Sequence, residues 1–81
     1  MIMMSYTKQI GEKILDTMQS KNISVVTLSK ESGYSVKDLY RLVNGNLILP
    51  PNGLERIADI LGIPVEELIY VEKGDILHEH K

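Results

Sequence analysis

Apolar residues recur at helical spacing along this chain, in segments that glycine and proline separate. Tyr6, Ile10, Ile14 and Met18 stand four residues apart, which predicts an amphipathic helix over about residues 5–20. No segment shows a clear two-residue alternation of the kind that marks a half-buried strand. A chain with this pattern must bury its apolar residues by packing helix against helix.

Turn-forming residues divide the middle of the chain into two short helices. Ser24 is placed to cap a helix over residues 25–32, and Gly33 permits a left-handed turn at its end. Ser35 is placed to cap the next helix, which the Asn-Gly pair at residues 44–45 ends. The sequence therefore predicts two short helices joined by a tight turn.

Two further helices follow a proline-containing connection. Residues 46–51 read NLILPP, which predicts a packed loop with Pro51 in the first turn of the next helix. The apolar residues of that helix are spaced i, i+3, i+4 and i+7: Leu54, Ile57, Ala58 and Leu61. Gly62 marks its end, and residues 64–69 form a last short helix with acidic residues in its first turn.

The predicted fold class is all-α, a compact five-helix bundle. The chain has 81 residues, which suits one small domain. It contains no Cys, so packing and helix caps rather than disulfides must stabilise it. Hydrophobic residues make up 43% of the chain and aromatic residues only 5%, which predicts an aliphatic core.

The charges are unevenly distributed. The net charge of −2 argues weakly against nucleic acid, because Lys and Arg supply most of the non-specific affinity for phosphate. Residues 20–50 nevertheless carry a net charge of +2, whereas residues 51–81 carry −4. The basic excess therefore surrounds the two short helices, and the acidity is displaced toward the C-terminal part.

The stretch SGYSVKDLYRLVNG, residues 32–45, predicts a helix with two different sides. Leu39 and Leu42 form an inward side that can pack on Leu28 of the preceding helix. The outward side contains the residues at i, i+1, i+4, i+5 and i+8: Val36, Lys37, Tyr40, Arg41 and Asn44. Two short helices joined by a tight turn form a helix-turn-helix, whose second helix can lie in the major groove. In the alternative interpretation, these residues are ordinary half-buried or solvated surface.

In their order and spacing, these features resemble the lambda-repressor-like helix-turn-helix regulators, often called the Xre family. The resemblance covers about residues 10–69 and includes IGEKI, the residues around Gly33 and Ser35, the Asn-Gly pair, and LERIADILGIPVEEL. It implies a lambda-repressor-like five-helix bundle and a prokaryotic or phage transcription regulator. Family members are mostly homodimers that bind palindromic operators.

The resemblance also implies which residues contact DNA. Members read bases with the first residues of the third helix, here Val36 and Lys37. They also use residues one turn later, here Tyr40 and Arg41, and Asn44 corresponds to a phosphate contact. The candidate DNA-binding residues are Ser24, Val25, Ser35, Val36, Lys37, Tyr40, Arg41 and Asn44.

The chemistry of these side chains suits base recognition. Arg41 has the planar fork that engages guanine O6 and N7, Lys37 can reach guanine or phosphate, and Val36 can pack on a thymine methyl. Many members place Gln where this chain has Val25, and a polar residue where it has Val36. These departures and the net acidity favour the alternative that the fold serves as a protein-interaction module, such as an antitoxin or antirepressor.

We expect a sequence-specific DNA-binding regulator, a repressor, that binds double-stranded DNA as a homodimer. Residues 5–70 are assigned to the helix-turn-helix DNA-binding domain, and residues 71–81 to a C-terminal tail that is either disordered or associated with the dimer. The predicted dimer surface combines the last helix with the segment after it: Leu68, Ile69, Tyr70, Ile76 and Leu77.

Other functions have little support in the sequence. His78 and His80 form a pair of imidazoles without a third ligand, so we expect no metal site. No nucleophile–base set, phosphate loop or paired carboxylates stand out, so we expect no enzyme, no cofactor and no small-molecule substrate. The N-terminal MIMM lacks the features of a secretory signal and no apolar run could span a bilayer, so a cytoplasmic protein without membrane contact is expected.

Overall fold

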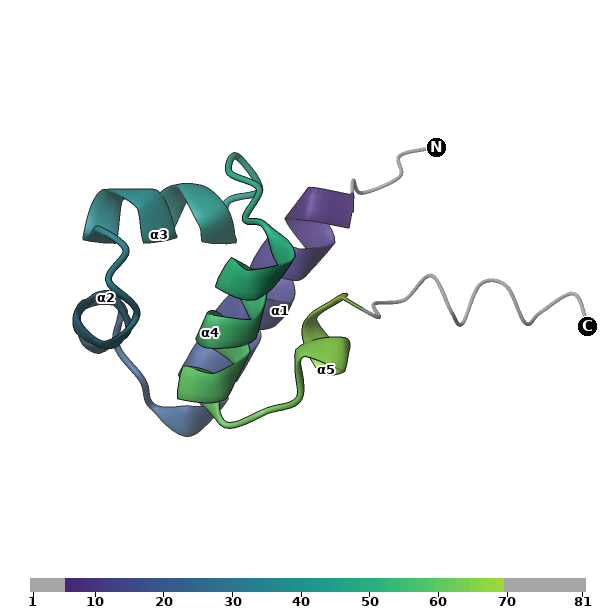
Figure 1. Ribbon diagram of the computed structural model, residues 1–81. Coiled ribbons are helices and arrows are strands. Elements are labelled where there is room, and N and C mark those ends of the chain that lie inside the picture. The colour runs from purple at the N-terminus through teal and green to yellow at the C-terminus, as the bar shows by residue number, and fades with distance from the viewer. Residues whose placement is uncertain (1–5, 70–81) are drawn as a thin grey trace, which may run out of the picture.

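The structure, a computed structural model, describes residues 6–69. This part of the chain contains five helices and no strand (Figure 1). The helices are α1 (Tyr6–Lys21), α2 (Val25–Ser32), α3 (Val36–Val43), α4 (Pro51–Leu61) and α5 (Val65–Ile69). The all-α bundle predicted from the sequence is confirmed, and each helix lies within one or two residues of its predicted position.

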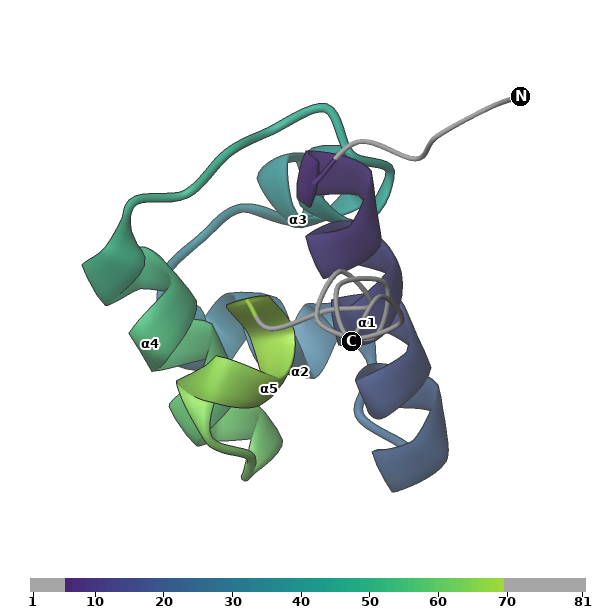
Figure 2. The ribbon, with the colours of Figure 1, turned by 90° about the vertical axis from the view of Figure 1, so that its right-hand side faces the viewer.

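The helices surround a single aliphatic core. In Figure 2, α1 and α4 form two sides of the molecule, and α2 lies between them behind α5. The core takes residues from every helix and from the connection before α4: Ile10, Ile14, Met18, Leu28, Leu39, Leu42, Leu49, Leu54, Ile57, Ala58, Leu61 and Leu68. Because the two short helices contribute Leu28, Leu39 and Leu42 to this core, their orientation is fixed by the same packing that stabilises the domain.

Not every apolar residue in the predicted patterns is buried. Tyr6, which continues the apolar spacing of α1, keeps 48% of its surface exposed; Leu15, on the same helix but outside that spacing, keeps 38%. Tyr6 instead donates a hydrogen bond of 2.7 Å from its hydroxyl to the carbonyl oxygen of Ile69. Leu68, predicted to form part of a dimer surface, is fully buried in the core. This prediction was wrong for Leu68, because Leu68 is the buried side chain through which α5 packs on the core between α1 and α4.

The contact between α1 and α3 depends on Gly11. A Cβ placed there would overlap the carbonyl oxygen of Leu42 and would lie 2.8 Å from that of Val43. These carbonyls belong to the last turn of α3, where a helix has no intrahelical donors left to satisfy its carbonyl groups. The missing side chain of Gly11 therefore lets the backbone of α1 approach the end of α3 directly.

We expect Gly11→Ala to destabilise the protein. An exposed Gly→Ala change within a helix usually stabilises by about 1 kcal/mol. Here the overlap with two carbonyl oxygens should outweigh that gain and cost roughly 1–3 kcal/mol, as overpacking in a core does. Thermal and urea melting would measure it, with Glu12→Ala on the exposed side of α1 as the control. A higher melting temperature for Gly11→Ala would rule out the close approach.

Candidate nucleic-acid interface

Helices α2 and α3 form a helix-turn-helix. In Figure 1, α2 is seen end-on while α3 lies across the view, so the two helices cross instead of running side by side. Leu28 of α2 and Leu39 and Leu42 of α3 are each at most 1% exposed, as the sequence predicted. The inner side of α3 is thus packed against α2 and the core, and its outer side is free of the rest of the bundle.

Hydrogen bonds of serine side chains hold the turn between the two helices. Gly33 has φ of 86°, and its N–H donates to the carbonyl oxygen of Ser29 at 3.0 Å. The hydroxyl of Ser29 donates to the carbonyl oxygen of Tyr34 at 2.6 Å, and the Tyr34 N–H donates to Ser32 Oγ at 3.1 Å. Sequence reasoning identified Gly33 but missed Ser29 and Ser32, although their short hydroxyl side chains beside a turn were a usable signal.

Tyr34 attaches this turn to α4. Its side chain is half-buried against the core. Its phenol oxygen occupies the space beside Gly53, where a Cβ would overlap it. The turn is therefore held from both sides, by the serine hydroxyls of α2 and by the backbone of α4.

Capping side chains begin both helices of the motif. Ser24 Oγ accepts a hydrogen bond of 3.1 Å from the Thr27 N–H, and Ser35 Oγ accepts one of 3.0 Å from the Asp38 N–H. Each bond satisfies one of the free N–H groups in the first turn of its helix. Ser24 and Ser35 are both exposed, so they are structural caps that also lie on the surface.

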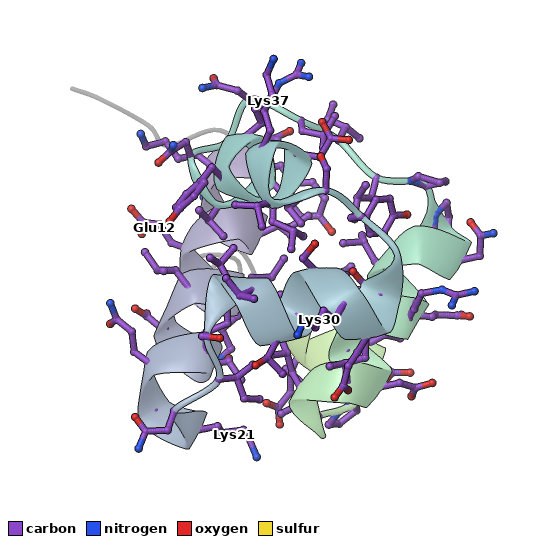
Figure 3. The ribbon with its side chains drawn as sticks, turned by 90° about the vertical axis from the view of Figure 1, so that its left-hand side faces the viewer. Glu12, Lys21, Lys30 and Lys37 are labelled. Atoms are coloured by element: carbon purple, nitrogen blue, oxygen red, sulfur yellow. The ribbon has the colours of Figure 1, made fainter. Side chains whose placement is uncertain are left out.

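The outer side of α3 brings most of the candidate residues together. Lys37, Arg41 and Asn44 are exposed, and Tyr40 keeps 53% of its surface accessible. Figure 3 shows Lys37 extending away from the bundle, at the end of the molecule opposite to Lys21. Polar and cationic groups therefore cluster on a single short helix.

The two valines among the candidate residues differ from the others. Val36, at the start of α3, is half-buried. Val25, at the start of α2, is half-buried and packs against the core. The exposed valine of α2 is Val26, which keeps 52% of its surface accessible and was not singled out from the sequence. Val25 thus has a packing role, and its side chain adds little to the outer surface.

Arg41 has an acidic neighbour on its own helix. Its Nη1 lies 3.7 Å from the Asp38 carboxylate, one turn earlier, and the two side chains are 51% and 42% exposed. Exposed pairs of this kind contribute about 0–1 kcal/mol, so a phosphate or a base can displace Asp38 at small cost. The pair holds the guanidinium near α3 without blocking it.

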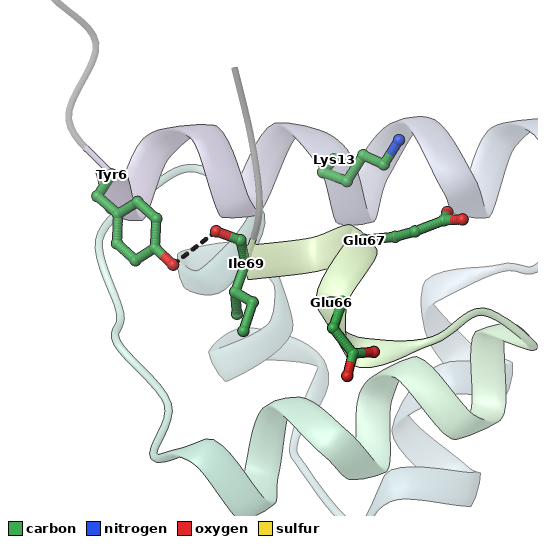
Figure 4. A pocket seen from close by; sticks show the side chains of 5 residues that line it. All are labelled: Tyr6, Lys13, Glu66, Glu67 and Ile69. Atoms are coloured by element: carbon green, nitrogen blue, oxygen red, sulfur yellow. Dashed lines mark hydrogen bonds between the residues drawn. The ribbon is translucent and has the colours of Figure 1, made fainter. Parts of the chain in front are cut away.

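Two acidic residues of α5, Glu66 and Glu67, lie away from this surface, beside a groove between α1 and α5. Figure 1 shows α5 on the side of the molecule opposite to α2. The groove has a volume of about 530 Å³, and Tyr6, Lys13, Glu66, Glu67 and Ile69 line it (Figure 4). The bundle thus has a cationic outer helix at one side and a groove with two glutamates at another.

Within residues 6–69, no three acidic or histidine side chains gather as ligands for a metal ion. None of the described helices is long and apolar enough to cross a membrane. The pair His78 and His80 lies outside the described residues.

Removal of a cap should loosen the start of α3. We expect Ser35→Ala to lower the free energy of unfolding by about 1 kcal/mol, because the Asp38 N–H loses its acceptor. Ser35→Asp should retain most of that stability, since Asp is an equally good N-cap. Urea denaturation followed by circular dichroism measures both variants. Equal losses for the two would show that the cap hydrogen bond contributes nothing.

A comparison with known protein families bears on this surface. A family model described as a Cro/C1-type HTH DNA-binding domain matches residues 13–74 of the chain. Comparisons with curated proteins and with solved structures gave no match. The match covers most of the chain, including both helices of the motif and the hydrogen-bonded turn between them. By this match and by its five-helix fold, the chain belongs to the family of Cro/C1-type helix-turn-helix DNA-binding domains.

Proposed function

We propose that this protein is a sequence-specific transcriptional repressor of prokaryotic or phage type, which binds an operator through the outer side of α3. The observation that carries the proposal is the division of α3 into two sides. Leu39 and Leu42 are buried, whereas Lys37 and Arg41 are exposed on the other side of the same helix. A helix of this kind can enter the major groove without disturbing the core.

Each exposed side chain has a proposed role on the DNA. Arg41 releases Asp38 and engages guanine O6 and N7, while Lys37 contacts guanine or phosphate. Val36 and Tyr40 make apolar contacts with base edges, and Asn44 binds a phosphate. Ser24, Val25 and Ser35 lie at the helix starts that approach the backbone; because Val25 packs on the core, its proposed contribution comes from its main chain.

The charge distribution supports this orientation. The protein as a whole has a net charge of −2, so its overall field does not attract DNA strongly. The basic excess of residues 20–50 coincides with α2 and α3, and the acidic excess of residues 51–81 begins with α4. Repulsion of the acidic part from phosphate favours an approach with α3 facing the DNA.

A homodimer on a palindromic operator is the proposed form. One helix-turn-helix buries only about 600–1,000 Å² on DNA, and two symmetry-related copies double the specific contact. With Leu68 buried, the proposed dimer surface comprises Ile69, which is 37% exposed, and the following residues Tyr70, Ile76 and Leu77, which lie outside the described residues. Analytical ultracentrifugation with and without operator DNA should show a complex with two protein chains. A single chain bound to one non-palindromic half-site would contradict the dimer.

The proposed repressor has one domain and a short tail. Residues 5–70 are the DNA-binding domain, and residues 71–81 are a C-terminal tail that lies outside the described residues. A repressor acts by occupying its operator, so we propose a binding protein without catalytic activity or cofactor. Its proposed place of action is the cytoplasm, where a prokaryotic or phage operator is found.

A protein-interaction module on the same fold is the second candidate. The exposed apolar side chains Val26 and Tyr40, 52% and 53% accessible, are the observation in its favour. A larger apolar patch with Val25 and Val36 would have favoured it more, but both valines are half-buried. Measured binding to selected DNA separates this candidate from a DNA-binding repressor.

The central test reverses the charge of α3. The DNA is a duplex recovered from random sequences by the parent protein. We expect the double variant Lys37→Glu and Arg41→Glu to lose binding, because attraction to phosphate and guanine becomes repulsion. Both side chains are exposed, so thermal melting should change little. The matched control, Lys21→Glu with Arg56→Glu, changes the net charge equally at exposed sites outside α2 and α3, and should retain most of the binding.

Single substitutions distinguish base contacts from phosphate contacts. Arg41→Ala should weaken binding by about 1–3 kcal/mol and relax the preference at one base pair. Asn44→Ala should weaken all sequences alike, since a phosphate contact carries no sequence information. Repeating the selection from random DNA with each variant measures both effects. An unchanged base preference for Arg41→Ala would remove Arg41 from the proposed readout.

A further inference from the structure

The loop between α3 and α4 exposes an isoleucine. Burial alternates along it: Leu47 is half-buried and Leu49 only 8% exposed, whereas Ile48 between them is 75% exposed. Ile48 is the most accessible large hydrophobic residue among those the structure describes. The sequence predicted a packed loop here, which is confirmed for Leu49 and does not account for Ile48.

Both ends of this loop are anchored. At its start, the Asn46 N–H donates to the carbonyl oxygen of Arg41 at 2.8 Å. At its end, Pro50 stands at the N-cap of α4, and its carbonyl oxygen accepts the Leu54 N–H at 3.0 Å. Because Leu47 and Leu49 pack against the core, Ile48 is turned away from it. Its exposure is therefore a feature of the packed loop.

The loop continues the outer surface of α3. Figures 1 and 2 show that it rises at the C-terminal end of α3 and runs along the upper edge of the molecule to α4. In Figure 3, which is turned about the same vertical axis, Lys37 also points upward. DNA that receives α3 and Lys37 in its major groove must therefore pass close to this loop.

The chemistry of the loop differs from that of α3. No residue from Leu42 to Leu54 is charged, so the loop itself carries no cation for a phosphate; the backbone of Lys8 in α1 lies against its start at Gly45. The sugar-phosphate backbone also presents the apolar carbons of its deoxyribose rings. An exposed aliphatic side chain gains free energy by covering such carbons, and this gain does not depend on counterion release.

Building on the proposed function, we propose that Ile48 is a further DNA-contact residue, which packs on deoxyribose rings beside the groove that α3 occupies. A protein partner suits the loop less well. The neighbouring Asn46 and Asn44 are exposed and polar, and Leu47 and Leu49 face inward, so Ile48 is not part of a broad apolar patch. It contributes affinity that salt does not screen, next to a helix whose contribution salt does screen.

The test measures affinity for the selected duplex over a series of salt concentrations. Ile48→Ala should weaken binding about three- to tenfold, by the same factor at every salt concentration, because only apolar contact is lost. Ile48→Lys should instead make the dependence of log K on log salt steeper by roughly 0.9, since it adds a phosphate contact. Lys37→Ala should make that dependence shallower. Leu15→Ala, an exposed aliphatic position on α1, should leave affinity unchanged.

The outcomes separate this proposal from the proposed function. If Ile48→Ala binds within twofold of the parent at all salt concentrations while Lys37→Ala binds weakly, the contact by Ile48 is overturned and the role of α3 remains. If the charge-reversed α3 variant still binds normally, both proposals fall. If Ile48→Ala changes the sedimentation of the free protein and not its DNA affinity, Ile48 contacts protein and the proposal is wrong. Because the Ile48 side chain is 75% exposed, its variants should melt at nearly the same temperature as the parent, and thermal melting of each variant checks this.

Discussion

The proposed recognition helix exists only because its inner side is buried. An isolated helix of eight residues, the length of α3, is not stable in water. Leu39 and Leu42 fix it on the core, and the carbonyl groups of its last turn meet the backbone of α1 at Gly11. The cations on its outer side, Lys37 and Arg41, are exposed and contribute little to stability. Because the inner side of α3 supplies its packing, the residues on its outer side can vary with the DNA sequence that is bound without unfolding the helix.

The turn before α3 is held by contacts of its own. A reading helix must be held at a fixed angle, and directional hydrogen bonds add to the core packing that orients α3. Here hydroxyls of Ser29 and Ser32 bond to the backbone of Tyr34, and the Tyr34 phenol lies against Gly53 of α4. These directional contacts join α2, the turn and α4 into one unit. Preorganisation of this kind lowers the entropy cost of ordering the interface on binding.

The sequence predicted the fold more completely than the surface. Helical spacing, the caps Ser24 and Ser35, and the turn at Gly33 are local signals, and the structure confirms each of them. Contacts between residues far apart in the sequence have no such local signal. Two examples are the approach of Gly11 to the carbonyl oxygen of Leu42 and the burial of Leu68 in the core. Val25 was assigned to the interface from the family resemblance; that its side chain is half-buried against the core could not be predicted, because burial depends on what the rest of the bundle places against it.

The exposed residues suggest how an acidic protein could still read DNA. Strongly basic proteins gain most of their affinity from phosphate neutralisation, which is the same for every sequence. With a net charge of −2 and an uncharged segment from Leu42 to Leu54, we expect this chain to have little of that non-specific term. Its binding would then depend on the few directed contacts of α3 and on apolar contact beside it. Low general affinity raises the ratio of specific to non-specific binding, and that ratio decides whether a regulator finds its operator among many competing sites.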